Sequence, residues 1–195
     1  TKLVADKLFI AANTYDNKRA STKFSSVRYG NVMGSRGSVI PYFLSIAESG
    51  ELQITDARMT RFMITQEVAI ELIWHAFEDM NGGEVYIKKI PSMNIIDIAK
   101  AVSESAKHRM IGIRPGEKIH EQMIGIEDAP FTYEYDSHYK ILPAIYDCFK
   151  NIEWIGDGKK VPNDFCYTSD NNTDWMSIST LKSWINEHKA TIGKF

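Results

Sequence analysis

The chain has 195 residues, 44% hydrophobic and 25% charged, a composition that excludes a disordered or fibrous protein and suffices for a buried core. A net charge of −2 gives no reason to expect a nucleic-acid partner. No apolar run reaches the roughly 20 residues of a membrane helix, and no charged-then-apolar pattern suggests export, so we expect no membrane partner and a cytoplasmic location. The two cysteines and five histidines lack the spacing of a disulfide framework or a metal site, so we expect neither.

The chain opens inside an amphipathic helical pattern. Leu3, Leu8 and Ala11 share one face of this expected helix. Neither an initiator Met nor a cap residue precedes it, so we expect the chain to be the downstream part of a longer protein. After a polar stretch, the pattern predicts a short strand over 24–29.

A glycine-rich loop, residues 30–38, joins this strand to a helix expected over 42–47. Three glycines in eight residues let backbone N–H groups approach a ligand closely. Ser35 and Ser38 add hydroxyl groups, and Arg36 adds a positive charge. The loop has neither the Walker spacing nor the dinucleotide fingerprint. We therefore favour a phosphate-facing loop, with a simple turn as the alternative.

Strands and helices alternate in the next segment. We expect a strand over 52–55, a helix from Thr65 that ends at 81–83, a strand over 84–88 and a helix capped by Asn94. The periodicity of the helix that begins at Thr65 predicts a buried face of Ala69, Ile73, Phe77 and Met80.

The alternation continues with a strand expected over 110–113. The turn 114–117 would then enter a helix that contains His120 and Met123. This order of elements is typical of an α/β layer fold with parallel strands. The following stretch is more irregular, until Ser177 caps a final helix.

Three arginines stand at junctions between expected strands and helices, and they are candidates for an anion pocket: Arg58, Arg61 and Arg114. The planar guanidinium group suits a diphosphate because it donates two parallel hydrogen bonds. Each arginine could equally be a solvated surface residue. Glu117, at the start of an expected helix, would complement the helix dipole or bind a hydroxyl group.

Six motifs occur in order along the chain, at 1–9, 27–39, 54–62, 89–93, 112–118 and 169–172. Together they closely resemble the inverting UDP-N-acetylglucosamine 4,6-dehydratases, the first enzymes of pseudaminic acid biosynthesis, within the extended short-chain dehydrogenase/reductase superfamily. The resemblance runs nearly from end to end.

This resemblance implies the C-terminal part of an extended Rossmann-type dehydrogenase/reductase with a small α/β substrate domain. The NADP-binding Rossmann domain would include 1–31 and 62–90, and the substrate domain would comprise 32–61 and 91–195. In the family, the dinucleotide loop, an Asp-Lys pair and the tyrosine of Tyr-x-x-x-Lys precede this stretch, and Lys2 matches the lysine of that motif. The resemblance also suggests a homo-oligomer.

The resemblance further implies two sets of site residues. Lys2 would be a catalytic residue that also binds the nicotinamide ribose. The cofactor side of the cleft would be lined by Val32, Met33, Gly34, Ser35 and Arg36. The substrate, UDP-N-acetylglucosamine, would be held by Asn31, Val39, Thr55, Arg114 and Glu117.

In the implied reaction, NADP takes hydride from C4 of the sugar, water leaves across C5 and C6, and hydride returns to C6 with inversion at C5. The isolated chain would be inactive because it lacks most of the NADP site. A nucleotide-sugar 4-epimerase, another 4,6-dehydratase or a non-catalytic UDP-sugar-binding module are the alternatives.

Overall fold

The computed structural model describes residues 2–14, 22–144 and 152–194, and the side chains of Lys2, Leu3 and Ile152 lie outside the described part, as does Cys148. The chain forms two compact units. The first unit comprises residues 1–29, 67–89 and 123–167, and the second comprises 30–66, 90–122 and 168–195. None of the described helices combines the length and apolar character that a membrane crossing requires.

The first unit is built on a mixed five-stranded sheet in the order β1-β5-β10-β9-β11. β1 (Ser26–Arg28) runs parallel to β5 (Val85–Lys88). β10 (His138–Ile141), β9 (Thr132–Glu134) and β11 (Lys159–Lys160) continue the sheet with antiparallel pairings. The parallel strands predicted over 24–29 and 84–88 are therefore confirmed, with shorter bounds.

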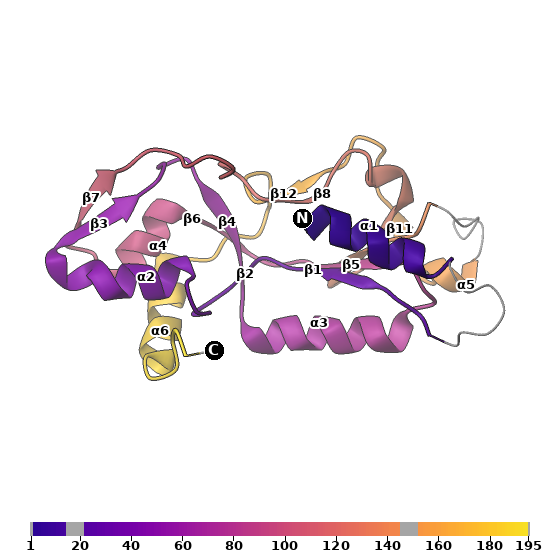
Figure 1. The fold of residues 1–195 in the computed structure, drawn as a ribbon, viewed down its shortest axis with the longest axis horizontal. Helices are drawn as coiled ribbons and strands as arrows, with labels where there is room; N and C mark the ends of the chain where they lie inside the picture. The colour runs from indigo at the N-terminus through magenta and orange to yellow at the C-terminus, as the bar shows by residue number, and fades with distance from the viewer. Residues whose placement is uncertain (1, 15–21, 145–151, 195) are drawn as a thin grey trace. The chain divides into compact units, whose positions relative to one another are not determined.

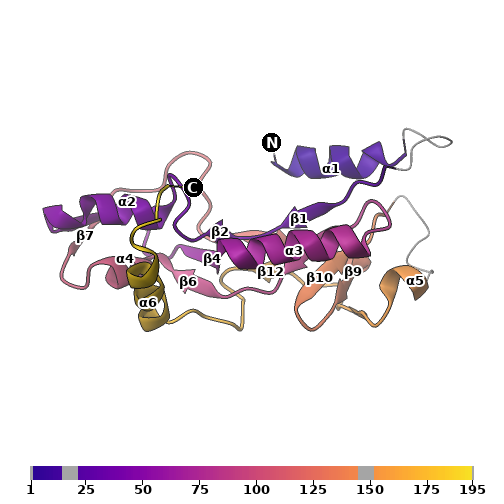
Figure 2. The same cartoon turned by 90° about the horizontal axis from the view of Figure 1, so that it is seen from below.

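Two helices cover opposite faces of the β1–β5 pair, as Figures 1 and 2 show. They are α1 (Lys2–Ala12), which confirms the predicted first helix, and α3 (Gln66–Asp79). Arg28 connects β1 to α1 and to the segment before η2, because its guanidinium group pairs with Asp6 of α1 at 2.8 Å and with Asp128 at 2.9 Å. The short helices η2 (Ala129–Phe131) and α5 (Ile152–Ile155) complete the unit.

The buried face of α3 differs from the prediction. Ala69 is buried as expected, but Leu72 and Ala76 fill the helix's remaining buried positions. Ile73 and Phe77 are 44% and 65% exposed, so their predicted burial was wrong. This helix carries apolar residues on more than one face, and periodicity alone does not show which face meets the sheet.

The second unit contains two small sheets. β3 (Glu51–Ile54) and β7 (Lys107–Met110) form a parallel pair. β2 (Asn31–Val32) runs parallel to β4 (Thr60–Ile64), which is antiparallel to β6 (Ser92–Asn94). β4 and β6 did not emerge from the sequence pattern.

Helices α2 (Val39–Ile46), η1 (Ala47–Ser49), α4 (Ile95–Val102) and α6 (Ile178–His188) complete the second unit (Figure 1). The core combines α2, α4 and α6 with β3, and it includes the fully buried side chains of Phe43, Leu52, Ile98 and Leu181.

Both predicted caps in this unit are confirmed. The Asn94 side chain accepts a hydrogen bond from the Ile96 N–H, and the Ser177 hydroxyl accepts one from the Thr180 N–H. Each cap satisfies a backbone donor that the first turn of the helix leaves unpaired.

The helix predicted around His120 and Met123 is wrong. The connection from 111 to 121 contains no helix, and β8 (Gln122–Ile124) follows it and pairs with β12 (Tyr167–Thr168). The division into units also differs from the expected domains. Residues 123–167 group with the first unit because β9 and β10 extend the sheet from β5, and residues 62–66 group with the second because β4 pairs with β2 and β6.

Candidate nucleotide-sugar site

A cavity of about 550 Å³ lies within the second unit. This volume is in the range that binds small organic ligands and cofactors. All five residues expected to hold the substrate line it: Asn31, Val39, Thr55, Arg114 and Glu117. The structure therefore brings together side chains that are up to 86 positions apart in the sequence, counted as 117 minus 31.

The topology explains why these residues meet. Thr55 directly follows β3, and the connection that carries Arg114 and Glu117 follows β7. β3 and β7 are parallel, so their carboxyl ends lie at one edge of the pair, where ligands of α/β sheets bind. Val39 is the first residue of α2, and Asn31 belongs to β2.

Arg114 and Glu117 belong to an exposed turn. The Glu117 N–H donates to the Arg114 carbonyl, and the Arg114 N–H donates to Glu117 Oε2, both at 3.1 Å. Gly116 has a φ of 86°, a left-handed conformation that favours glycine. The Arg114 guanidinium group has no hydrogen-bond partner among the described residues, so its planar donors remain available for an anion.

The other two candidate arginines are engaged elsewhere. Arg61 lines the cavity, but its terminal nitrogens donate to the carbonyls of Thr60 at 2.7 Å, Ile119 at 2.9 Å and Lys118 at 3.2 Å. Arg58 is an exposed side chain that pairs with Asp56 at 2.7 Å. Hydrogen bonds from Arg58 lower the pKa of the Asp56 carboxyl to about 2. Arg61 therefore holds the backbone of residues 118–119 in place, and Arg58 forms an ion pair at the surface.

The amino end of α2 also faces the cavity, through Ser38 and Val39. Ser38 occupies the N-cap position, but its buried hydroxyl oxygen makes no hydrogen bond within the described part of the chain. A helix N-terminus attracts negative charge through its unpaired N–H groups. Together with Arg114, this end of α2 makes the cavity suitable for an anionic ligand.

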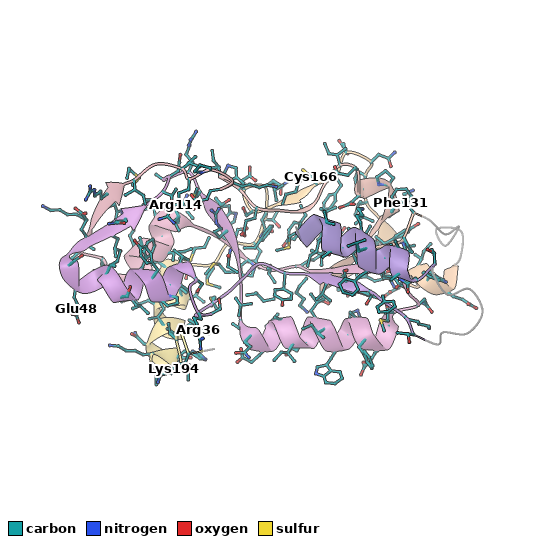
Figure 3. The ribbon with its side chains drawn as sticks, viewed as in Figure 1. Arg36, Glu48, Arg114, Phe131, Cys166 and Lys194 are labelled. Atoms are coloured by element: carbon teal, nitrogen blue, oxygen red, sulfur yellow. The ribbon has the colours of Figure 1, made fainter. Side chains whose placement is uncertain are left out.

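The residues expected on the cofactor side do not line this cavity. Met33 is 2% exposed and packs in the core of the second unit, so only its backbone could face a ligand. Gly34 lies against Trp184, where a Cβ atom would come within 2.8 Å of the indole ring. Arg36 is exposed and lies apart from Arg114 (Figure 3). Lys2 belongs to α1, and its side chain is outside the described residues.

Two polar residues of the cavity, Tyr42 and Gln53, were not identified from the sequence. The Tyr42 hydroxyl donates to Gln53 Oε1 at 3.0 Å, and both side chains line the cavity. Tyr42 follows Val39 by three positions on α2, so the helical period places both on one face and could have indicated Tyr42. Nothing in the sequence of β3 singles out Gln53.

Comparisons with known proteins identify a family and several relatives. The family model described as "Polysaccharide biosynthesis protein" matches residues 1–143. The chain is 47% identical over 193 residues to the UDP-N-acetylglucosamine 4,6-dehydratase (inverting) of two Campylobacter jejuni strains, covering 95% of this chain and 58% of each relative. It is 37% identical to a UDP-glucose 4-epimerase of Rickettsia bellii, covering 93% of this chain and 54% of that protein.

The fold is also found in a solved structure, the X-ray structure of Pen from Bacillus thuringiensis, with a TM-score of 0.80 and 31% identity over 96% of this chain and 56% of that one. The chain thus spans somewhat more than half the length of these relatives. The α/β fold class and the resemblance to the inverting dehydratases are both confirmed. By the match over residues 1–143, the chain belongs to the polysaccharide biosynthesis protein family.

Proposed function

We propose that this chain supplies the nucleotide-sugar-binding part of an inverting UDP-N-acetylglucosamine 4,6-dehydratase. One observation carries the proposal: the five residues that the resemblance assigns to the substrate line a single cavity within one unit. The identity of 47% to dehydratases of that name supports the same choice. The proposed net reaction removes water across C5 and C6 of the sugar and inverts C5, at the start of pseudaminic acid biosynthesis.

Several residues of the cavity have a proposed part in holding the ligand. The guanidinium group of Arg114 donates to the diphosphate, in the cavity that the amino end of α2 and Ser38 also line. One Glu117 oxygen holds the turn, and the other can accept from a ribose hydroxyl. Val39 forms part of the apolar wall, and Thr55 offers a hydroxyl group. These contacts would orient the sugar with respect to the reacting groups.

NADP is the proposed cofactor. Ser35 and Arg36 fit one of its phosphate groups in chemical character, because they place a hydroxyl and an exposed guanidinium group on one turn. Lys2 is proposed to bind the nicotinamide ribose. When bound, the dinucleotide supplies reversible hydride acceptance, so the net reaction consumes no external oxidant or reductant. A homo-oligomer and a cytoplasmic location remain predictions.

The test is product analysis with the full-length gene product, UDP-N-acetylglucosamine and NADP. A dehydratase of this type converts the C6 hydroxymethyl group into a methyl group, which proton NMR detects directly. An unchanged hydroxymethyl group together with inversion at C4 would instead identify an epimerase, the activity that the Rickettsia relative's name suggests. Turnover without a C6 methyl signal therefore refutes the dehydratase.

Binding to this chain tests the cavity separately. Calorimetric titration with UDP-N-acetylglucosamine should give saturable binding, and Arg114→Gln should weaken it. Arg109→Gln is the matched control, because Arg109 is an exposed arginine of β7 that pairs with Glu51 and does not line the cavity. Equal weakening by both variants would attribute the effect to general charge. Saturable binding without turnover by the full-length gene product would favour the non-catalytic binding module.

A further inference from the structure

The side-chain amide of Asn31 is held in one orientation. Its Nδ2 atom donates to Glu121 Oε1 at 3.0 Å and Oε2 at 3.1 Å, and to the Phe62 carbonyl at 3.3 Å. An amide nitrogen carries two hydrogens, and these protein acceptors occupy both directions. The Asn31 Oδ1 atom has no hydrogen-bond partner among the described residues, although Asn31 lines the cavity. The polar atom left for a ligand is therefore an acceptor.

Glu121 decides this orientation because an ionised carboxylate can only accept hydrogen bonds. Besides Asn31 Nδ2, its Oε2 atom accepts the backbone N–H of Phe62 at 2.8 Å. Rotating the Asn31 amide by 180° would place Oδ1 against the carboxylate, with two acceptors facing each other and no hydrogen between them. The charged carboxylate thus excludes the alternative orientation, which a neutral amide at position 121 would allow.

The position of Glu121 is itself fixed by a buried serine. The Glu121 N–H donates to Ser169 Oγ at 2.8 Å, and the Ser169 N–H donates to the Glu121 carbonyl at 2.8 Å. Ser169 is fully buried, and its hydroxyl also donates to the Thr60 carbonyl at 3.1 Å. Asn31 and Phe62 therefore contact the Glu121 carboxylate, while Ser169 holds the Glu121 backbone on both sides, and rotation of that backbone would break both bonds to Ser169.

We infer that Glu121 is a positioning residue that locks the Asn31 amide with Oδ1 toward the ligand. It follows that the ligand group opposite Asn31 is a hydrogen-bond donor, a hydroxyl or amide N–H, rather than a phosphate oxygen. The ligand half of this inference rests on the proposed nucleotide-sugar site. The positioning half rests only on the contacts of Asn31, Glu121 and Ser169.

A double-mutant cycle tests the ligand half. Glu121→Gln lets the Asn31 amide turn, so the affinity for UDP-N-acetylglucosamine should fall by about five- to tenfold, the effect of one misdirected hydrogen bond. Asn31→Ala should weaken binding similarly, and the double variant should bind no more weakly than Asn31→Ala alone. Glu104→Gln, the same substitution at an exposed side chain of this unit, should leave affinity unchanged.

Glu121→Gln binding within twofold of the wild type, or independent effects of the two substitutions, would overturn the inference. Side-chain amide NMR signals test the positioning half without ligand. The Asn31 NH₂ resonances, assigned by their loss in Asn31→Ala, should be protected from exchange in the wild type and lose that protection in Glu121→Gln. Unchanged Asn31 signals would refute the positioning role. A wild-type chain that shows the protected signals but does not bind the nucleotide sugar would refute the proposed function instead.

Discussion

Lowering the pH should destabilise the first unit through His138. This histidine lies on β10, is 7% exposed, and stacks on Tyr135 with ring centroids 4.5 Å apart. Its Nε2 atom lies 3.2 Å from Nε2 of His75 on α3. Burial, followed by repulsion from His75 and Lys140, lowers the pKa of His138 to about 4, against the attraction of Asp79. The folded protein therefore holds this imidazole neutral at a pH where the unfolded chain protonates it.

The size of the effect follows from linkage. The unfolded chain takes up the His138 proton near pH 6.5, whereas the folded protein does so only near its pKa of about 4. The unfolded state binds more protons in this window, so stability is retained above pH 6.5 and is lost as the pH falls toward 4. Between pH 7 and pH 5 the loss attributable to His138 is about 2 kcal/mol.

Urea denaturation at pH 7 and pH 5 measures this loss. Other groups titrate in this range, so the informative quantity is the difference between the wild type and His138→Gln. The glutamine variant keeps a polar side chain without a titrating proton, and its stability should change by about 2 kcal/mol less between the two pH values. Equal pH dependence in both proteins would refute the explanation.

Three further predictions concern the second unit. Leu181→Ala should lower the free energy of unfolding by about 3 kcal/mol in urea denaturation, because Leu181 is fully buried, and a change below about 1 kcal/mol would contradict this packing. Gly30→Ala should weaken binding of UDP-N-acetylglucosamine in calorimetry. The added Cβ atom would lie 2.5 Å from the Phe62 carbonyl oxygen and would displace the backbone next to Asn31. Unchanged affinity would show that β2 and β4 accommodate the methyl group without loss of binding. Arg61→Lys removes the planar guanidinium group that donates to the Ile119 carbonyl, so limited proteolysis should cleave the 111–120 connection faster than in the wild type. An equal cleavage rate would show that Arg61 does not hold this connection in place.

Local signals predicted the parts of the fold that depend on local contacts. The caps at Asn94 and Ser177 involve residues two or three positions away, so the sequence pattern contains the whole interaction. The short strands between 122 and 168 have two to four residues each and acquire their conformation from partners elsewhere in the chain. A pattern of so few residues does not define a strand without its partner.

The mistaken helix around His120 has a comparable cause. The segment carries a turn followed by polar and apolar residues at plausible helical spacing, but its backbone is bound to distant groups. Thr60 donates its N–H to the Ile119 carbonyl, and Ser169 pairs with the backbone of Glu121. These tertiary hydrogen bonds replace those of a helix.

In the candidate site, too, the residues that belong to motifs were predicted, and a residue that acts through a tertiary contact was missed. Family motifs identified five cavity residues, and the parallel pair β3–β7 explains why residues after those two strands converge. Glu121 was missed because its importance lies in the single orientation it imposes on Asn31, a relation that spacing along the chain does not reveal.

The order in which the stretches of the second unit occur has a consequence during synthesis on the ribosome. That unit is assembled from three separate segments, and the last of them, 168–195, contributes Leu181 and Ile185 to its core and Ser169 to the backbone of Glu121. The nascent polypeptide therefore cannot complete the unit until α6 has left the exit tunnel. Until then, the apolar surface of α4 that α6 covers remains exposed to aggregation and to chaperone capture.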